Sequence, residues 1–290
     1  MLHLKGIGTA IITPFTNGAV DYKAYKTLID RQSGTDVRFI VALGTTAETS
    51  CLTEKEKINL LDTTMTVYNG PVVVGAGTNS LQGTIDNFRA LERFRPDAWL
   101  VVVPYYNRPT QEGLYQYYST LSCETDIPII LYNVPGRTGT NMLPETTARL
   151  SELPNIIGIK EAAGIEQCRD TRKMCHENFF VFSGNDDQWL SLMPYGIDGV
   201  ISVASNVTPG MIAEVFELYS AGNLSEAQAL NEQLIPLYEA CFFESNPIAV
   251  KGALSLLGLC NNELRLPLTS ATSSTLNRIK AVLDGINNFY

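Results

Sequence analysis

Short apolar runs rich in β-branched residues alternate with amphipathic segments along most of this 290-residue chain. Eight such runs occur, the first ending at Thr13 and the others just before Thr45, Thr78, Tyr105, Tyr132, Lys160, Ser183 and Ser202. Strands that alternate with helices form parallel sheets with right-handed crossovers. Eight repeats favour an α/β fold of the closed (β/α)8 or TIM-barrel type, because an open dinucleotide-binding sheet would need a GxGxxG or GxxxxGK[ST] loop that the chain lacks.

The segments between these runs have helix-start signals. We expect helices to begin after Asp21, Thr53, Ser80, Thr110, Pro144, Gly164 and Asp187. The clearest is a capping box, in which Glu56 follows Thr53 by three residues, and Asn69-Gly70 should end that helix. After Val207 only helical segments follow, near 208–220, 224–243, 246–257 and 270–287, with Pro236 expected to kink the longest. We therefore predict a catalytic barrel over residues 1–222 and a C-terminal helical region over residues 223–290.

Charge and composition exclude several classes of protein. The net charge is -9 and no Lys/Arg cluster occurs, which argues against nucleic acid or an anionic membrane as a partner. No signal peptide and no membrane-spanning apolar stretch is apparent. The six cysteines form no CxxC pair and are expected to be reduced thiols of a cytoplasmic protein. The only histidines, His3 and His176, lack metal-site spacing, so no metal site is expected.

Lys160 closes the otherwise apolar run in NIIGIKEA, residues 155–162. Burying an unpaired ammonium within a strand is costly, but at the end of a strand the amine can enter a pocket, where burial favours its neutral, nucleophilic form. Many lysines at strand ends simply extend into water, so this residue alone does not decide the function.

The other strand ends supply matching chemistry. Barrel enzymes place their active sites at the carboxyl ends of the strands. There the chain carries GTTAE at 44–48, PYYNRP at 104–109 and YNVPGRTG at 132–139. Hydroxyls and backbone N–H groups can hold a carboxylate, tyrosine can move protons and arginine binds carboxylates through two hydrogen bonds. An amine, tyrosines, hydroxyls and an arginine together fit Schiff-base chemistry on a keto acid.

These motifs occur in a specific order: GTTAE, PYYNRP, YNVPGRTG, IIGIKEA and SGND, followed by NPIAVKGAL at 246–254 and LRLPLT at 264–269. In this order the chain resembles the dihydrodipicolinate synthase family, also called 4-hydroxy-tetrahydrodipicolinate synthases, of the class I aldolase superfamily of pyruvate-dependent lyases. The resemblance implies condensation of pyruvate with L-aspartate 4-semialdehyde in lysine (diaminopimelate) biosynthesis. It also implies a homotetramer, built as a dimer of dimers, with no cofactor beyond a covalent lysine imine with pyruvate.

The resemblance also assigns roles to single residues. Lys160 would form the imine, Tyr132 would relay protons beside it, and Thr45 would link Tyr132 to Tyr106 from a neighbouring subunit. The substrate-binding residues implied are Thr46 for the pyruvate carboxylate, Arg137 for the carboxylate of aspartate semialdehyde, and Gly184 and Ile201 for backbone contacts.

The chain departs from the family pattern at two places. Ala47 replaces the usual glycine after the threonine pair, which costs no strain if its φ is negative. Some relatives bind lysine between subunits, at positions that match Thr49, Ser50, Glu54, Lys57, Asn79, Gly83 and Tyr105. Lys57 would repel the ammonium of lysine and Gly83 offers no counter-charge, so we predict a vestigial site and weak or absent inhibition by lysine.

Two alternatives remain. N-acetylneuraminate lyases and 2-keto-3-deoxy sugar acid aldolases of the same superfamily share the lysine and the tyrosine, but they lack the arginine that matches Arg137. A non-catalytic barrel that only binds a partner is the alternative from another class, in which Lys160 would be solvated.

Overall fold

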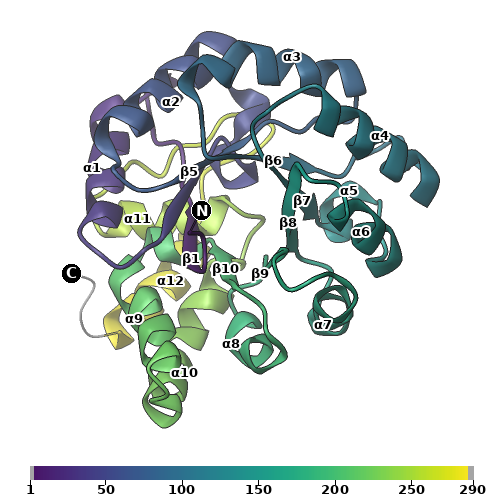
Figure 1. Ribbon diagram of the computed structural model, residues 1–290. Helices are drawn as coiled ribbons and strands as arrows, with labels where there is room; N and C mark the ends of the chain where they lie inside the picture. The colour runs from purple at the N-terminus through teal and green to yellow at the C-terminus, as the bar shows by residue number, and fades with distance from the viewer. Residues whose placement is uncertain (1–2, 287–290) are drawn as a thin grey trace. The chain divides into compact units, whose positions relative to one another are not determined.

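The computed structural model describes residues 3–286, and within them eight parallel strands close into a barrel in the order β1-β10-β9-β8-β7-β6-β5-β4 (Figure 1). The strands are β1 (Gly6–Ala10), β4 (Phe39–Ala42), β5 (Val72–Gly75), β6 (Ala98–Val102), β7 (Ile129–Asn133), β8 (Ile156–Glu161), β9 (Phe180–Ser183) and β10 (Gly199–Ser202). The predicted (β/α)8 barrel with C-terminal helices is therefore confirmed. The observed strands run through Tyr132 and Lys160 rather than ending before them, so both side chains have strand geometry.

Helices follow the strands where the capping residues predict them. They are α1 (Tyr22–Ser33), α2 (Glu54–Val67), α3 (Leu81–Leu91), α4 (Gln111–Cys123), α5 (Pro135–Thr138), α6 (Pro144–Ser151), α7 (Ile165–Met174) and α8 (Trp189–Leu192), then α9 (Pro209–Ser220), α10 (Leu224–Ala240), α11 (Ile248–Leu256) and α12 (Ser273–Gly285). The capping box at Thr53 is present in full. Asp21, Ser80 and Thr110 also accept N-cap hydrogen bonds. The helix after Asp187 is a single short turn, and α10 continues through Pro236, where the kink stays a prediction.

The chain groups into two compact units, residues 3–5 with 71–201 and residues 6–70 with 202–286. The first unit contains β5 to β9, and Figure 1 shows α4, α6 and α7 on the outer side of these strands. Its core includes the fully buried Trp99 of β6, whose ring stacks on Phe88 of α3 with centroids 5.0 Å apart. Burial of such large rings is the main favourable term for packing helices on this part of the sheet.

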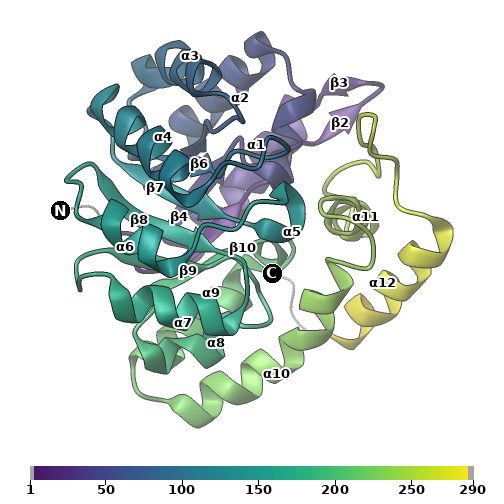
Figure 2. The same cartoon turned by 90° about the vertical axis from the view of Figure 1, so that its right-hand side faces the viewer.

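The second unit joins β1 and β4 with the C-terminal helices. A two-stranded hairpin, β2 (Phe15–Thr16) and β3 (Ala19–Val20), turns at Asn17 and Gly18, both of which have positive φ as a tight hairpin requires. Figure 2 shows this hairpin beside the loop that precedes α12. Glu263 of that loop accepts hydrogen bonds from the backbone N–H groups of Asn17 and Gly18. The sequence analysis missed this hairpin.

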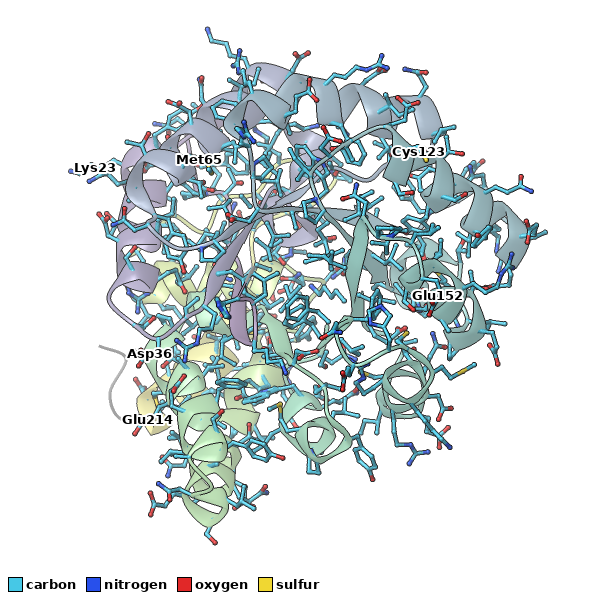
Figure 3. The ribbon with its side chains drawn as sticks, viewed as in Figure 1. Lys23, Asp36, Met65, Cys123, Glu152 and Glu214 are labelled. Carbon is cyan, nitrogen blue, oxygen red and sulfur yellow. The ribbon has the colours of Figure 1, made fainter. Side chains whose placement is uncertain are left out.

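The cysteines agree with the expectation of free thiols. All six lie among the described residues and none is in a disulfide. Cys123, labelled in Figure 3 near the end of α4, is exposed, whereas Cys168, Cys175 and Cys241 are buried. Among the helices of residues 3–286, none is both long and apolar enough to cross a membrane. The predicted domain boundary at residue 222 is not tested by this arrangement and stays a prediction.

Candidate active site

Lys160 and Tyr132 are neighbours across two parallel strands. In the ladder between β7 and β8, Tyr132 is opposite Lys160 and Asn133 is opposite Glu161. Both members of the first pair are buried, with Lys160 5% and Tyr132 7% exposed, and the Nζ atom of Lys160 lies 4.7 Å from the centroid of the Tyr132 ring. A lysine so far from water is not a solvated strand-end residue. The structure therefore brings together the predicted nucleophile and the predicted phenol.

Gly184 provides the room that Lys160 needs. It follows β9, and its N–H donates a hydrogen bond of 2.7 Å to the carbonyl oxygen of Glu161. A Cβ atom at Gly184 would lie only 2.7 Å from the Cβ of Ala162 and 3.1 Å from the Cε of Lys160. The absence of a side chain is what allows the backbone to pass so close to the amine. Gly184 thus lies directly beside Lys160, and its predicted contact with the substrate stays a prediction.

The loops after β6 and β7 are joined by hydrogen bonds. The hydroxyl of Thr140 donates to the Pro104 carbonyl at 3.0 Å, and the Tyr106 N–H donates to the Thr138 carbonyl at 3.2 Å. Tyr106 itself has a φ of 72° and is 88% exposed. Within one chain, then, the ring of Tyr106 is not packed against the buried lysine pair. Arg137 lies on the single-turn helix α5 directly after β7 and is exposed.

A second polar cluster lies on the opposite face of the same two strands, and the sequence analysis missed it. Glu161 accepts hydrogen bonds from the Ala163 N–H at 2.8 Å, from Asn133 at 3.0 and 3.2 Å, and from Gln167 of α7 at 3.1 Å. Burial raises the pKa of the Glu161 carboxyl to about 7, against the lowering effect of these donors. The signal was available: side chains alternate along a strand, so a polar residue directly after Lys160 and one after Tyr132 must share the other face.

The threonine turn belongs to the second unit. Thr45–Ala47 form one turn of 3-10 helix after β4, in which Thr45 is exposed and Thr46 is 3% exposed. The Thr46 hydroxyl accepts a hydrogen bond of 3.0 Å from the side-chain amide of Asn246. Ala47 is not among the described residues with positive φ, so the glycine of the family pattern is not needed for this backbone. The left-handed residue of the turn is Glu48, with φ 53°.

The residues of the predicted effector site fall in both units. In the second unit Thr49 and Ser50 form the 3-10 turn η2 (Thr49–Cys51), and Glu54 and Lys57 lie at the start of α2. In the first unit the Asn79 carbonyl accepts a hydrogen bond of 2.8 Å from Asn107, and the Gly83 N–H donates to the N-cap Ser80. Tyr105, the remaining residue, is 40% exposed. Whether these positions bind lysine is not decided by the fold, and the vestigial site stays a prediction.

The closed barrel, with a lysine and a tyrosine buried side by side on neighbouring strands, is the architecture of a (β/α)8-barrel enzyme. The model of the dihydrodipicolinate synthetase family matches residues 3–286, and the chain belongs to this family.

Two kinds of relatives agree with this assignment. The chain is 46% identical to the 4-hydroxy-tetrahydrodipicolinate synthase of Thermotoga neapolitana over 286 residues, which covers 96% of this chain and 97% of the relative. It is also similar to the crystal structure of dihydrodipicolinate synthase from Thermotoga maritima, with a TM-score of 0.95, 46% identity and coverage of 97% and 98% of the two chains. A monomeric dihydrodipicolinate synthase variant is equally similar, with a TM-score of 0.95, 45% identity and coverage of 97% and 96%.

Proposed function

We propose that this protein catalyses the reaction of a 4-hydroxy-tetrahydrodipicolinate synthase, the condensation of pyruvate with L-aspartate 4-semialdehyde in lysine biosynthesis. The observation that carries the proposal is the buried pair formed by Lys160 and Tyr132, with Nζ 4.7 Å from the ring centroid. We further propose that the protein acts in the cytoplasm and requires no cofactor beyond the lysine imine itself.

The proposed reaction begins when the neutral amine of Lys160 attacks the keto carbon of pyruvate. Loss of water gives an imine, which withdraws electrons and allows the methyl group to lose a proton without a metal ion. The resulting enamine carbon attacks the aldehyde of the second substrate and forms the new carbon–carbon bond. The amine of that substrate then replaces the Lys160 amine in the imine, which closes the ring and frees the enzyme.

Proton transfer in these steps is assigned to Tyr132. A phenol next to the amine can donate a proton to the departing water and accept one from the methyl group. We propose that Thr45 links this phenol to Tyr106 of a neighbouring subunit. The 88% exposure of Tyr106 in the single chain supports this, because the ring is available to another copy. The proposed assembly is a homotetramer built as a dimer of dimers, which sedimentation analysis can test.

Carboxylate recognition is assigned to residues on several loops. Thr46 is proposed to bind the carboxylate of pyruvate, and backbone groups of Gly184 and Ile201 are proposed as further contacts to pyruvate. Arg137, exposed on α5, binds the carboxylate of aspartate semialdehyde through paired hydrogen bonds. The arginine also favours this reaction over that of the sugar acid aldolases, whose second substrate presents hydroxyl groups.

Borohydride reduction in the presence of pyruvate, followed by peptide mass mapping, tests the mechanism. An adduct on Lys160 is expected, and none is expected in Lys160→Ala. Lys251 is the matched control, because it is also a buried lysine but is held in an ion pair with Glu48. No adduct on Lys160, or full turnover by Lys160→Ala, would overturn the proposal. Parallel assays with pyruvate and aldehydes of sugar acids identify the second substrate.

Regulation by lysine is a separate property from the reaction itself. We propose that lysine inhibits weakly or not at all, because Lys57 places a like charge and Gly83 no counter-charge at positions that match the effector site of some relatives. Titration of lysine into the steady-state assay tests this proposal. Inhibition at or below low millimolar lysine would contradict it.

A further inference from the structure

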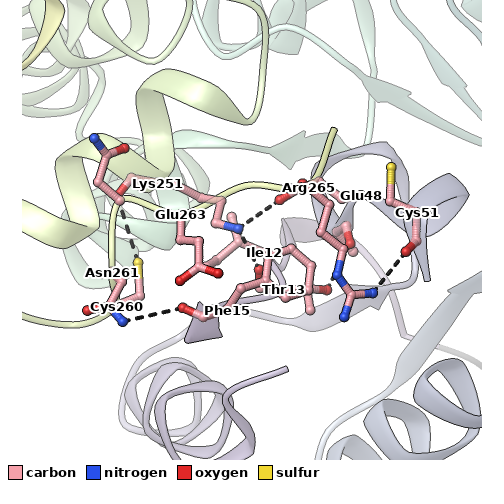
Figure 4. A network of polar contacts seen from close by, with 12 residues as sticks. Ile12, Thr13, Phe15, Glu48, Cys51, Lys251, Cys260, Asn261, Glu263 and Arg265 are labelled. Atoms are coloured by element: carbon pink, nitrogen blue, oxygen red, sulfur yellow. Dashed lines mark hydrogen bonds and ion pairs between the residues drawn. The ribbon is translucent and has the colours of Figure 1, made fainter. Parts of the chain in front are cut away.

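The GTTAE turn is held in place by the C-terminal region of the second unit and by Thr13. Each contact joins residues far apart in the sequence: Asn246 to the Thr46 hydroxyl at 3.0 Å, Lys251 Nζ to Glu48 Oε1 at 2.7 Å, the Arg265 N–H to Glu48 Oε2 at 3.0 Å, and the Thr13 hydroxyl to the Ala47 carbonyl at 2.8 Å. Figure 4 shows Lys251, Glu48, Arg265 and Thr13 converging in this network. The turn therefore takes its shape from residues that lie outside it.

The contact between Asn246 and Thr46 sets the direction of a proton. A hydroxyl has one hydrogen to donate and two lone pairs to accept with. Because the Asn246 amide donates to the Thr46 oxygen, the Thr46 hydrogen points away from Asn246. Both residues are buried, with Thr46 3% and Asn246 5% exposed, so this hydrogen bond does not compete with bulk water. The Thr46 hydroxyl is then oriented to donate its hydrogen to a second acceptor.

The ion pair of Lys251 and Glu48 fixes the backbone that carries Thr46. Both side chains have no exposed surface. The Lys251 ammonium donates to Glu48 and to the Thr13 carbonyl at 2.8 Å, and it faces the Phe15 ring with its Nζ 4.2 Å from the centroid. Its three hydrogens are thus directed at a carboxylate, a carbonyl and an aromatic face. This holds Glu48 in the left-handed conformation, which a residue with a side chain rarely adopts alone.

We propose that Asn246 is a positioning residue for the proposed reaction: it orients the Thr46 hydroxyl so that its proton is donated to the carboxylate of pyruvate. The buried Lys251–Glu48 pair fixes the backbone of the turn that carries Thr46. The inference rests on the proposed function, in which Thr46 binds that carboxylate. It makes one part of the C-terminal helical region a support for pyruvate binding.

A double-mutant cycle tests the inference. Asn246→Ala should raise the KM for pyruvate about tenfold, the size expected for a hydrogen bond to a charged group, with a much smaller change in kcat and in the KM for the second substrate. In a Thr46→Val background, which lacks the hydroxyl, the same substitution should leave the KM for pyruvate unchanged. Additive effects in the two backgrounds, or a fall in kcat without a rise in the KM for pyruvate, would show that Asn246 is only structural.

Two further variants keep the test decisive. Asn246→Asp preserves the side-chain volume but removes the amide donor, so its KM for pyruvate should also rise, and a wild-type KM would overturn the inference. Asn262→Ala is the control, because Asn262 exchanges two hydrogen bonds with the Ala271 backbone in the same region, and only its Tm should fall. Borohydride trapping on Lys160 at saturating pyruvate should persist in every variant, which separates failure here from failure of the proposed function.

Discussion

Tyr132 and Lys160 are opposite each other in the ladder of β7 and β8, and the Nζ atom of Lys160 lies 4.7 Å from the centroid of the Tyr132 ring. Neighbouring parallel strands have fixed spacing, so this register holds the phenol beside the amine without a flexible loop. A site built on strands in this way keeps the two proposed reacting groups in place between turnovers. Two substitutions can therefore test separately the Tyr132 hydroxyl and the space around Lys160.

Substitution of Tyr132 by Phe should retain the ring beside Lys160 and remove only the hydroxyl. Because the imine can still form, borohydride should trap pyruvate on Lys160, while kcat falls by about 10²- to 10⁴-fold as proton transfer is lost. Steady-state kinetics and mass mapping on one preparation measure both. Tyr118→Phe is the control, since Tyr118 is fully buried and donates to the Val101 carbonyl at 3.0 Å. It should lose about 1 kcal/mol of stability and no activity.

Substitution of Gly184 by Ala should damage the lysine pocket directly. The added Cβ would lie 2.7 Å from the Cβ of Ala162 and 3.1 Å from the Cε of Lys160, so one of them must move. We expect slower imine formation, measured as the rate of borohydride trapping, and a lower Tm. Gly285→Ala is a suitable control, because among residues 3–286 no atom outside the adjacent residues and the helix backbone lies within 4 Å of its added Cβ. Equal trapping rates in the two variants would show that Gly184 does not shape the pocket.

Local patterns in the sequence were enough to predict the barrel. Apolar runs and capping residues such as Thr53 depend on neighbours a few residues away, so the strands and most helices could be located. The hairpin at Phe15–Val20 was missed because strands of two residues show no alternation, although Asn17-Gly18 is a typical hairpin turn. Lys160 is 5% exposed, so it does not extend into water as many lysines at strand ends do.

The supporting residues of the site could not be predicted in the same way. Lys251 and Asn246 contact the GTTAE turn across about 200 residues of sequence, and no local pattern indicates such a pairing. Lys251 is recognisable in the sequence as an unusual lysine within an apolar helix, but only the folded structure shows that Glu48 is its partner. Glu161 was overlooked because the residues at the strand end were read as one set instead of being divided between two faces.

Glu161 should make the stability of the protein depend on pH. Its pKa rises from 4.5 to about 7 on burial, so the folded state binds the proton more tightly than the unfolded state. The stability it contributes is fully present below pH 4.5 and is lost as the pH rises through 7, by at most about 3 kcal/mol. Glu161→Gln stays neutral, so denaturant unfolding should show the variant gaining stability relative to wild type between pH 5 and 8.

Glu56 is a suitable control, because its pKa is shifted in the opposite direction to that of Glu161. Its hydrogen bonds with Arg265 lower the pKa of the Glu56 carboxyl from 4.5 to about 2. The stability that it contributes is therefore present above pH 4.5 and is lost as the pH falls towards 2. Glu56→Gln should be less stable than wild type at pH 7, with the difference vanishing in acid. If both variants changed in the same direction with pH, burial would not be the cause of the Glu161 effect.

Removing one charge of the buried Lys251–Glu48 pair should destabilise the protein more than removing both charges. Lys251→Met leaves the Glu48 carboxylate buried without its ammonium, which should lower the free energy of unfolding by about 3–5 kcal/mol. In the double variant with Glu48→Gln no charge remains to be buried, and the new amide oxygen can still accept the Arg265 N–H, so part of the loss should be recovered. Lys26→Met serves as the control, because Lys26 pairs with Asp30 at the surface of α1, where both side chains are more than half exposed, and should have little effect. Denaturant unfolding at pH 7 measures all three. A double variant as unstable as Lys251→Met would mean that the methionine fails to pack, and that the pair is kept for its volume and not for its charges.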